Sequence, residues 1–385
     1  MAASLAARAL GRASFEEAFA APAFVRAMLD FESALASAQV AEGLIAEAHA
    51  QAIDRGCATI AIDTGRLVEE GRRNASLAVP LVKRLREHVS RDSASAARDV
   101  HLGATSQDVL DTATVLRLRP CLDEADRTLD HAVRSLARRA REHRTTPMLA
   151  RTLMQPALPI AAGLKLARWA AALAQDRQRL AESQATALAV QLGGPVGALE
   201  AMCGKGAAVR HRMALALGLA DVPEWQSHRN AWIDLLDRVA LVVASAGKIA
   251  RDVALASQAE VGEMLEAPPS AGVGGSSSMP HKRNPVACAR ALAAAVRVPG
   301  LVASLHAAAV GEHERALGAW QAELALVPEI AACLGSALDF LETIADSLVI
   351  DAARMKANLE RHGERGAIDP QAVDEILAGL APELT

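Results

Sequence analysis

A chain of 385 residues is long enough for roughly two or three domains with a large buried core. Hydrophobic residues make up 51% of the sequence but aromatic residues only 2%, so aliphatic side chains must form that core. The formal net charge of −4 excludes a broadly basic surface for nucleic acid. Any anionic ligand must therefore be held by local cations.

Cysteine spacing and hydropathy indicate the cellular compartment. The cysteines are odd in number and lack CxxC spacing, which argues against a disulfide framework or a zinc site; they are Cys57, Cys121, Cys203, Cys288 and Cys333. The sequence lacks both a run of eighteen uninterrupted apolar residues and the apolar segment of a secretory signal. We expect a protein of the reducing cytoplasm, with neither a membrane nor a nucleic acid as partner.

Helical periodicity dominates the chain from its N-terminal part onward. Apolar side chains recur three or four positions apart between Phe24 and Val40, and no segment shows convincing strict alternation. Glycine and proline punctuate the pattern, for example at Pro120 and Pro147. We predict an all-α protein built as a long-helix bundle, with a first helical domain over residues 1–111.

The first polar cluster, residues 101–108, reads His-Leu-Gly-Ala-Thr-Ser-Gln-Asp. Thr105 or Ser106 is placed to cap a helix, because hydroxyl side chains accept hydrogen bonds from unpaired first-turn amides. The hydroxyls and the free N–H groups predict an anion cradle with His101 beside it. A plain helix cap next to a surface histidine fits the same pattern at least as well.

The second cluster, residues 151–156, precedes a long helix predicted over residues 157–192. Arg151 offers a cation and Gln155 an amide, although an arginine in such a place is more often a surface charge. The glycine-rich segment 191–197 predicts a tight loop and no dinucleotide site, because no strand precedes it and the GxGxxG spacing is missing. Another long helix is predicted over residues 230–264.

The third cluster, residues 274–285, reads Gly-Gly-Ser-Ser-Ser-Met-Pro-His-Lys-Arg-Asn-Pro. Its glycines and serines predict a mobile polar loop, for which a solvated surface turn is the plain alternative. Asn284 is a favoured N-cap and Pro285 suits the first position of a helix predicted over residues 285–324. Lys282 and its arginine neighbour would repel the positive end of that helix unless an anion joined them, so we favour an anion site.

Further cations and the C-terminal part complete the chain. His313 and Arg315 add a titratable imidazole and a positive charge, although His313 alone is more often structural. The bundle domain is predicted over residues 112–350 and a short helical appendage over residues 351–385. The sequence has no HExxH, Walker-type loop, GxSxG elbow or ligand-spaced Cys/His/acid cluster, so it implies neither a metal nor a nucleotide cofactor.

The three clusters together resemble the signature blocks of the fumarase/aspartase superfamily. Residues 275–285 resemble its highly specific GSSxMPxKxNP motif, residues 101–108 resemble its HxGxTSxD block, and residues 151–159 lie where its third block falls. Within the superfamily, the bacterial 3-carboxy-cis,cis-muconate cycloisomerases are favoured by residues 27–36, 286–290 and 313–323. The resemblance extends from about residue 10 to about residue 360.

This resemblance implies a homotetramer in which long central helices form one bundle and each active site draws on several subunits. The implied reaction closes 3-carboxy-cis,cis-muconate to the γ-lactone 4-carboxymuconolactone, in the protocatechuate branch of the β-ketoadipate pathway, without a cofactor. Ser276 would be the catalytic serine on a loop that closes over the substrate. The candidate substrate-binding residues are His101, Thr105, Ser106, Arg151, Gln155, Ser277, Lys282, Asn284, His313 and Arg315.

Two departures from the relatives bear on this interpretation. Adenylosuccinate and argininosuccinate lyases place a histidine after the threonine of the third block, where this chain has Leu153, and this favours the cycloisomerases. Relatives usually continue with further helices past the position of Asp351, and that region is short here. The alternatives are an adenylosuccinate-lyase-like enzyme that releases fumarate and a non-catalytic homologue.

Overall fold

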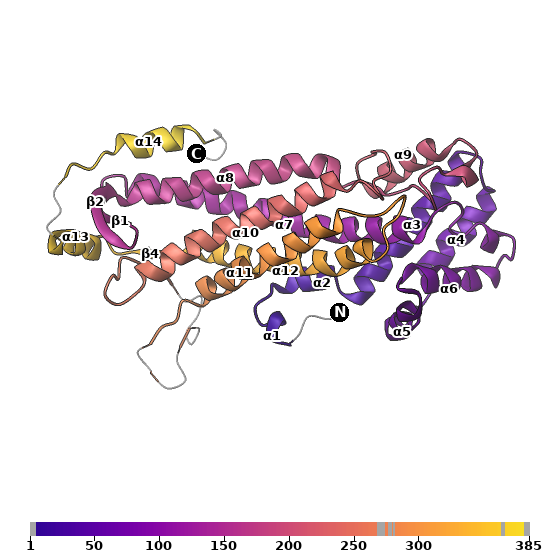
Figure 1. The fold of residues 1–385 in the computed structure, drawn as a ribbon, viewed down its shortest axis with the longest axis horizontal. Helices are drawn as coiled ribbons and strands as arrows, with labels where there is room; N and C mark the ends of the chain where they lie inside the picture. Colours follow the sequence, from indigo (N-terminus) through magenta and orange to yellow (C-terminus); the bar gives the residue numbers. More distant parts are fainter. Residues whose placement is uncertain (1–4, 268–273, 276–278, 280–281, 363–365, 381–385) are drawn as a thin grey trace.

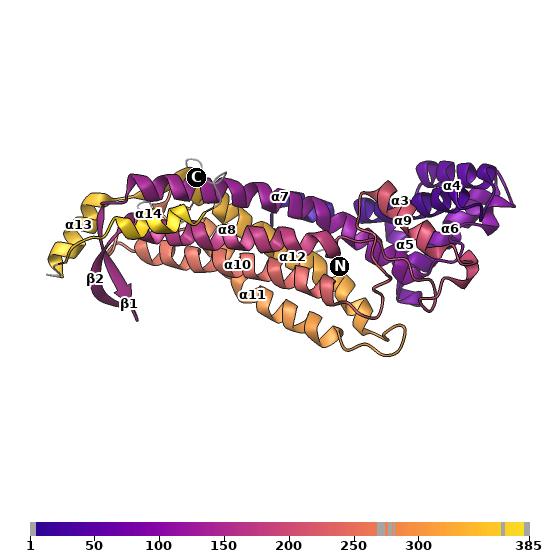
Figure 2. The ribbon, with the colours of Figure 1, turned by 90° about the horizontal axis from the view of Figure 1, so that it is seen from above.

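A computed structural model describes residues 5–267, 274–275, 279, 282–362 and 366–380. In this part of the chain, five long helices run side by side along an elongated molecule (Figures 1 and 2). Leu122, Leu236 and Phe340 are fully buried among them. The helices are α7 (Ser106–Glu142), α8 (Ala162–Ala187), α10 (Asn230–Ala256), α11 (Val286–Ala308) and α12 (Ala319–Ser347). The predicted all-α long-helix bundle is confirmed.

Shorter helices pack at the end of the bundle where α7 begins (Figure 1). A separate core forms there around Phe31, Leu81 and Met213, and it includes a helix from the middle of the chain. These helices are α3 (Ala21–Ala41), α4 (Glu47–Thr59), α5 (Thr64–Asn74), α6 (Ala78–Ser90), a 3-10 turn (Ala96–Arg98) and α9 (Gly206–Leu217). Along α7, Ala113 belongs to this core and Val115 to that of the bundle. The predicted boundary at residue 111 stays a prediction.

Helix α7 is the longest described helix, with 37 residues, and it runs straight through Pro120. The expected break at this proline is wrong. Pro120 lies on an exposed side of the helix, where solvent can reach the carbonyl group that the proline ring leaves unpaired. On the opposite side, Leu118 and Leu122 are fully buried and hold the helix against the core.

The chain also contains strands that the periodicity did not predict. β1 (Pro147–Thr152) and β2 (Gln155–Ala161) form an antiparallel hairpin, so α8 starts at residue 162 and not at residue 157. Its two turn residues, Leu153 and Met154, have φ values of 51° and 67°, as type I′ turns require. The extended backbone that precedes proline explains why no helix starts within β2, which contains two prolines.

Two of the predicted long helices are shorter in the structure. The segment 285–324 is divided between α11 and α12 by a loop over residues 309–318, which ends at Gly318 with a φ of 94°. Helix α10 ends at residue 256, and the chain then forms β3 (Met264–Glu266). Strand β3 pairs antiparallel with β4 (Leu348–Ile350), which follows α12.

The remaining helices are short. α1 (Leu5–Arg8) and α2 (Ala13–Ala18) precede α3, and α2 packs on α7. After β4, α13 (Ala352–Arg361) packs on β1, and α14 (Gln371–Ala378) packs on α8. Arg144 and Asp374 form an ion pair of 2.7 Å that links α14 to the bundle.

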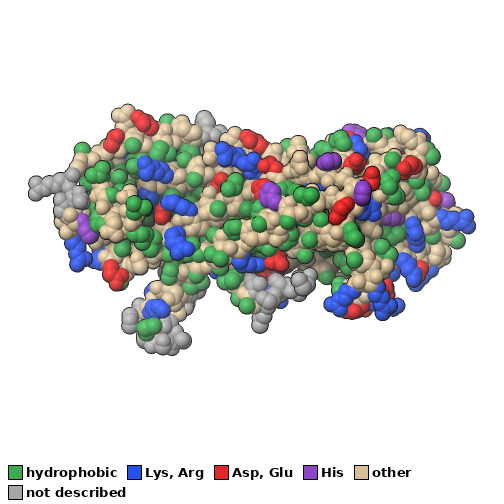
Figure 3. Space-filling view, viewed as in Figure 1, with side chains coloured by type: hydrophobic (Ala, Val, Ile, Leu, Met, Phe, Trp, Pro, Cys, Tyr) green, Lys and Arg blue, Asp and Glu red, His purple; other side chains and the backbone are tan. Residues whose placement is uncertain are grey.

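Helices α11 and α12 are long and apolar enough to cross a membrane by length and composition alone. Both pack with α10 in the bundle, and the apolar window of α12 is 61% buried, as in a core helix. The window of α11 is only 22% buried, and Val296 on this helix is 75% exposed. The face shown in Figure 3 accordingly carries many hydrophobic side chains between charged ones along the bundle.

All cysteines of the chain are free thiols. Cys57, Cys121, Cys288 and Cys333 are buried, whereas Cys203 is exposed just before α9. Burial is the main cause that raises the pKa of each of the four buried thiols.

Candidate active site

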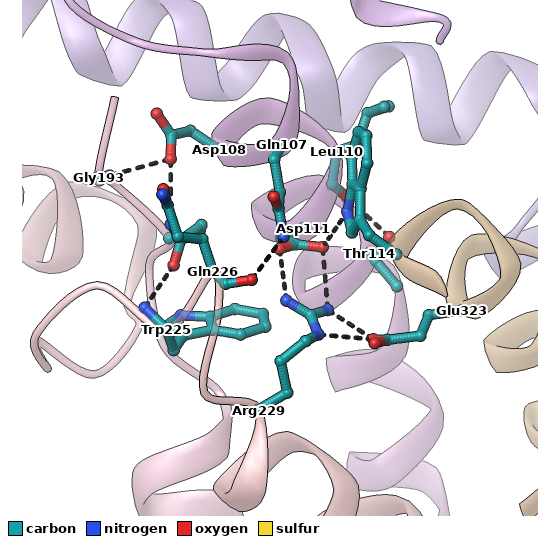
Figure 4. A network of polar contacts seen from close by, with 12 residues as sticks. Gln107, Asp108, Leu110, Asp111, Thr114, Gly193, Trp225, Gln226, Arg229 and Glu323 are labelled. Atoms are coloured by element: carbon teal, nitrogen blue, oxygen red, sulfur yellow. Dashed lines mark hydrogen bonds and ion pairs between the residues drawn. The ribbon is translucent and has the colours of Figure 1, made fainter. Parts of the chain in front are cut away.

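The N-terminus of α7 is organised around a buried carboxylate. Thr105 is the N-cap, and its amide donates to Oδ2 of Asp108 at 2.9 Å. Asp108 also accepts hydrogen bonds from the amides of Gly193 (2.9 Å) and Gly194 (3.0 Å) and from Nε2 of Gln191 (3.1 Å) (Figure 4). The carboxylate thereby fixes the glycine-rich loop over residues 191–197 against the start of α7.

Asp108 is fully buried, and burial raises its pKa to about 6. The hydrogen bonds from the amides act in the opposite direction. The carboxyl group is therefore mostly ionised at neutral pH.

His101 lies just before this cap. Its Nδ1 is 2.7 Å from Oε1 of Glu32, a residue of α3 whose side chain is fully buried. Ser106 is the first residue of α7 and is half-buried. The structure thus brings His101, Thr105 and Ser106 together at one end of the bundle.

A second buried polar cluster lies one turn further along α7. Arg229 donates to both carboxylate oxygens of Asp111, at 2.8 and 3.1 Å, and to Glu323 at 2.7 Å (Figure 4). Nε1 of Trp320 donates to Asp111 at 3.1 Å. The cluster joins three helices near their N-termini. Arg229 is the N-cap of α10, Trp320 and Glu323 belong to α12, and Asp111 belongs to α7.

Two carboxylates share one guanidinium in this cluster. Burial raises the pKa of Glu323, although Arg229 acts in the opposite direction. No sequence motif marks Asp111, Arg229 or Glu323 as a cluster, because their positions are far apart along the chain.

The loop over residues 309–318 packs beside this cluster. Nη2 of Arg315 donates to the carbonyl groups of Gly194 (3.3 Å) and Pro195 (2.8 Å). His313 is exposed and lines a small pocket together with residues that include Glu323. His313 and Arg315 therefore lie at the same end of the bundle as Thr105.

Arg151 and Gln155 lie at the opposite end of the bundle, on the β1–β2 hairpin (Figure 1). They are separated from Thr105 by the length of α7, about 55 Å for a helix of this size. Arg151 donates to both oxygens of the buried Glu263 at 2.7 Å, and Asn358 donates to the same carboxylate at 2.8 Å. The charge of Arg151 is thus already balanced within the chain.

The signature loop is described only at its base. Ser276 and Ser277 lie outside the described residues, while Lys282 and Asn284 are exposed. The amide of Asn284 donates to the carbonyl of Gly274 at 2.7 Å, so the two sides of the loop meet there. Gly274 has a φ of 74°, and a Cβ atom at this position would lie 2.7 Å from the Asn284 carbonyl oxygen.

Glu266 occupies the N-terminus of α11, which corrects the expectation for Asn284. The helix begins at Val286, and its first amides, those of Ala287 and Cys288, each donate to the Glu266 carboxylate at 2.9 Å. Asn284 is therefore not the N-cap. The positive end of this helix is neutralised by a side chain from β3, so it is not the open anion site that the sequence predicted.

Known proteins resemble this chain over most of its length. The profile of a family described as lyase matches residues 12–300. A 3-carboxy-cis,cis-muconate cycloisomerase of Bradyrhizobium diazoefficiens is 46% identical, over 91% of this chain and 77% of that protein. One of Pseudomonas putida is 40% identical, over 94% of this chain and 88% of that protein.

Among solved structures, the 3-carboxy-cis,cis-muconate lactonizing enzyme of Pseudomonas putida aligns with a TM-score of 0.86 and 38% identity. The alignment covers 92% of this chain and 79% of that one. Because sequence and fold agree over nearly the whole chain, this protein belongs to the lyase family of the fumarase/aspartase superfamily that includes the 3-carboxy-cis,cis-muconate cycloisomerases.

Proposed function

We propose that this protein is a cycloisomerase that converts 3-carboxy-cis,cis-muconate to 4-carboxymuconolactone in the cytoplasm. The observation that carries the proposal is the signature loop, residues 275–285, in a chain 46% identical to an enzyme named for this substrate. Leu153 also supports this proposal. Adenylosuccinate and argininosuccinate lyases have a histidine at this position, and this chain does not.

The reaction is an intramolecular addition. One substrate carboxylate oxygen forms a bond to an alkene carbon, the alkene electron pair moves toward a neighbouring carboxylate, and the adjacent carbon then takes up a proton. No outside nucleophile is required. Holding the flexible anion in attack geometry lowers the barrier by about 7 to 11 kcal/mol in the best intramolecular examples.

Ser276 supplies the proton in this proposal. A serine hydroxyl is a weak acid in water, so the step requires stabilisation of the alkoxide by Lys282 and exclusion of solvent when the loop closes. Thr105 and Ser106 bind a substrate carboxylate, whose charge increases as the enediolate forms. Solvent returns the proton to Ser276 after the lactone leaves.

We further propose that the active site is completed only by assembly of several chains, as in a homotetramer. The candidate residues support this, because His101, Thr105 and Arg315 lie at one end of the bundle and Arg151 lies at the other. The exposed apolar surface of α11, including Val296, is suited to contact with another copy of the chain.

The direct test is to incubate the purified protein with 3-carboxy-cis,cis-muconate and follow the ultraviolet absorbance of the conjugated diene. We expect the band to disappear, because lactone formation removes the conjugation. Adenylosuccinate and argininosuccinate serve as comparison substrates, from which we expect no fumarate. An unchanged diene band would contradict the proposal, and fumarate release would favour the lyase alternative.

The Ser276→Ala variant tests the catalytic role. We expect kcat to fall by about 10²- to 10⁴-fold, the usual value of a well-placed proton donor, with unchanged helicity by circular dichroism. Ser278→Ala in the same loop is the matched control and should keep kcat within a small factor of the wild type. A Ser276→Ala protein with normal turnover would remove this residue from the mechanism.

A further inference from the structure

Residues 100–102 are held in place by side chains from two helices of the N-terminal core. On α3, Glu32 binds the ring of His101, and Nε2 of Gln39 donates to the carbonyl of Leu102 at 2.7 Å. These two residues are seven positions apart and so lie on one face of the helix. On α6, Arg86 donates to the carbonyl of Val100 at 3.0 and 3.3 Å.

His101 itself adopts a strained backbone conformation. Its φ is 63°, in the left-handed region that residues other than glycine seldom occupy. Such a conformation is unfavourable and persists only where the surroundings impose it. The surrounding helices therefore fix the direction of the imidazole, and do not leave it as a freely moving surface side chain.

Glu32 is an unusual partner because it is fully buried while His101 remains 13% exposed. Its Oε1 lies 2.7 Å from Nδ1 of the ring, and its Oε2 has no hydrogen-bond partner among the described residues. A buried carboxylate without a compensating charge is costly. A protonated imidazole is the group in direct contact that supplies this compensation.

The charged groups around the ring act in both directions. Burial, the largest influence, lowers the pKa of His101, and Arg86 on α6 also lowers it. Glu32 on α3 and Asp108 on α7 raise it, and their effect prevails, so the pKa of His101 is above its ordinary value. The ring therefore holds its second proton to higher pH than a free histidine does.

We propose that Glu32 is a positioning residue: by holding Nδ1 of His101, it turns the Nε2 edge of the ring toward a carboxylate of the bound substrate. Because Glu32 contacts Nδ1, Nε2 lies on the opposite edge of the ring, where it has no hydrogen-bond partner among the described residues. It is thereby available for a charge-assisted hydrogen bond beside Thr105. This inference rests on the proposed function, because the anion it needs is the polycarboxylate substrate.

The proposal has a defined pH dependence. Below the raised pKa, His101 is an imidazolium and binds the carboxylate, and above it this interaction weakens. KM for the muconate should therefore rise as the pH increases through the pKa of His101. Without Glu32 the same rise should begin at lower pH.

Glu32→Gln is the test variant, because it keeps the shape and one acceptor oxygen but removes the charge. We expect KM to increase by about tenfold at neutral pH, with a smaller change in kcat, since a hydrogen bond to a charged group is lost. Asp346→Asn is the matched control: it removes the carboxylate of another 2.7 Å histidine pair, with His131, at an exposed site. This control should leave KM unchanged.

A second readout does not require turnover. Diethylpyrocarbonate reacts with the neutral form of histidine and not with the protonated form. The folded protein is modified at a series of pH values and then digested, and the modified fraction of each histidine-containing peptide reports the pKa of that histidine. In Glu32→Gln the midpoint for His101 should move to lower pH, while that for His131 stays where it was. A wild-type midpoint at or below about 6.5, the ordinary histidine value, would overturn the proposal even if the variant failed to fold.

Different results contradict the proposed function and the role of Glu32. A wild-type protein that leaves the muconate unchanged contradicts the proposed function. A Glu32→Gln protein with wild-type KM and an unshifted His101 midpoint contradicts the role of Glu32 while the proposed function stands.

Discussion

At the scale of single residues, Asp108 determines how the candidate site is built. Both of its oxygens accept hydrogen bonds from groups on two segments far apart in the sequence, Thr105 and the 191–194 loop. Its pKa is raised to about 6 by burial, so the folded chain binds this proton more tightly than the unfolded chain does. The carboxyl group therefore links the stability of the site to pH.

The Asp108→Asn variant should remove this link. Between about pH 4 and pH 6 the folded wild type retains a proton that the unfolded chain has lost, so the stability contributed by Asp108 falls as the pH rises through this window. The free energy of unfolding in urea, measured from pH 4 to pH 8, should fall for the wild type relative to Asp108→Asn up to about pH 6. Above about pH 6 the difference between the two proteins should change little. Asp123→Asn, at an exposed position of α7, is the control, and an identical pH profile for both variants would exclude this role.

The residues of the site could be predicted where the signal is local. His101, Thr105 and Ser106 stand next to one another in the sequence, and a hydroxyl before an apolar helical pattern indicated the cap that the structure contains. Glu32, Arg229 and Glu323 gave no such signal. Their partners, His101 and Asp111, lie far from them in the sequence, and no single segment specifies such pairings.

At the scale of secondary-structure elements, β3 and α11 are joined through one carboxylate. Glu266 takes the place of an N-cap for α11, because its two oxygens accept from the amides of Ala287 and Cys288. The sequence placed Asn284 in this role, since a cap residue usually comes just before its helix. A capping side chain some twenty positions away, on a strand, leaves no local pattern to detect.

Replacing Glu266 by glutamine should destabilise the protein by about 1 kcal/mol, because one of the two amides loses its acceptor and the helix dipole loses its counter-charge. The midpoint of urea unfolding at neutral pH measures this. Glu260→Gln, on the exposed segment before β3, controls for a change of net charge. If both variants unfold at the wild-type midpoint, the carboxylate does not hold the start of α11.

The strands were missed for a similar reason. Pro156 and Pro159 favour extended backbone in the residues before them, yet apolar residues continue without interruption into α8, so periodicity alone placed the helix start at residue 157. Conversely, Pro120 did not break α7, because the burial of Leu118 and Leu122 on the opposite side of the helix outweighs the lost hydrogen bond. Local backbone restriction before proline decided the first case, and tertiary packing decided the second.

At the scale of the whole molecule, the candidate residues are distributed over both ends of an elongated bundle. The long-helix architecture was predictable, because helical periodicity and a nearly non-aromatic composition both favour it. The separation of Thr105 from Arg151 was not, since it follows from the direction in which α7 crosses the whole bundle. Within one chain these groups cannot act on one small substrate.

Mixed assemblies test whether chains share their sites. Thr105→Ala and Lys282→Met should each be nearly inactive alone, but co-expressed in equal amounts they should regain on the order of a quarter of wild-type activity, because some sites then receive both native contributions. Thr105→Ala mixed with Ser106→Ala provides the control, since both changes affect the same contribution. No recovery in a mixed oligomer verified by mass spectrometry would indicate that each site draws on a single chain.

Cys203 is the one exposed thiol of the chain and can therefore carry a probe. Cys203 follows a short 3-10 turn (Glu200–Met202), and Met202 of that turn lies against Gly103 in the first polar cluster. The other four thiols are shielded and hard to ionise. A maleimide fluorophore should therefore label the wild-type chain at a single position, next to the segment that carries His101, and its emission would report ligand binding there without any engineered cysteine.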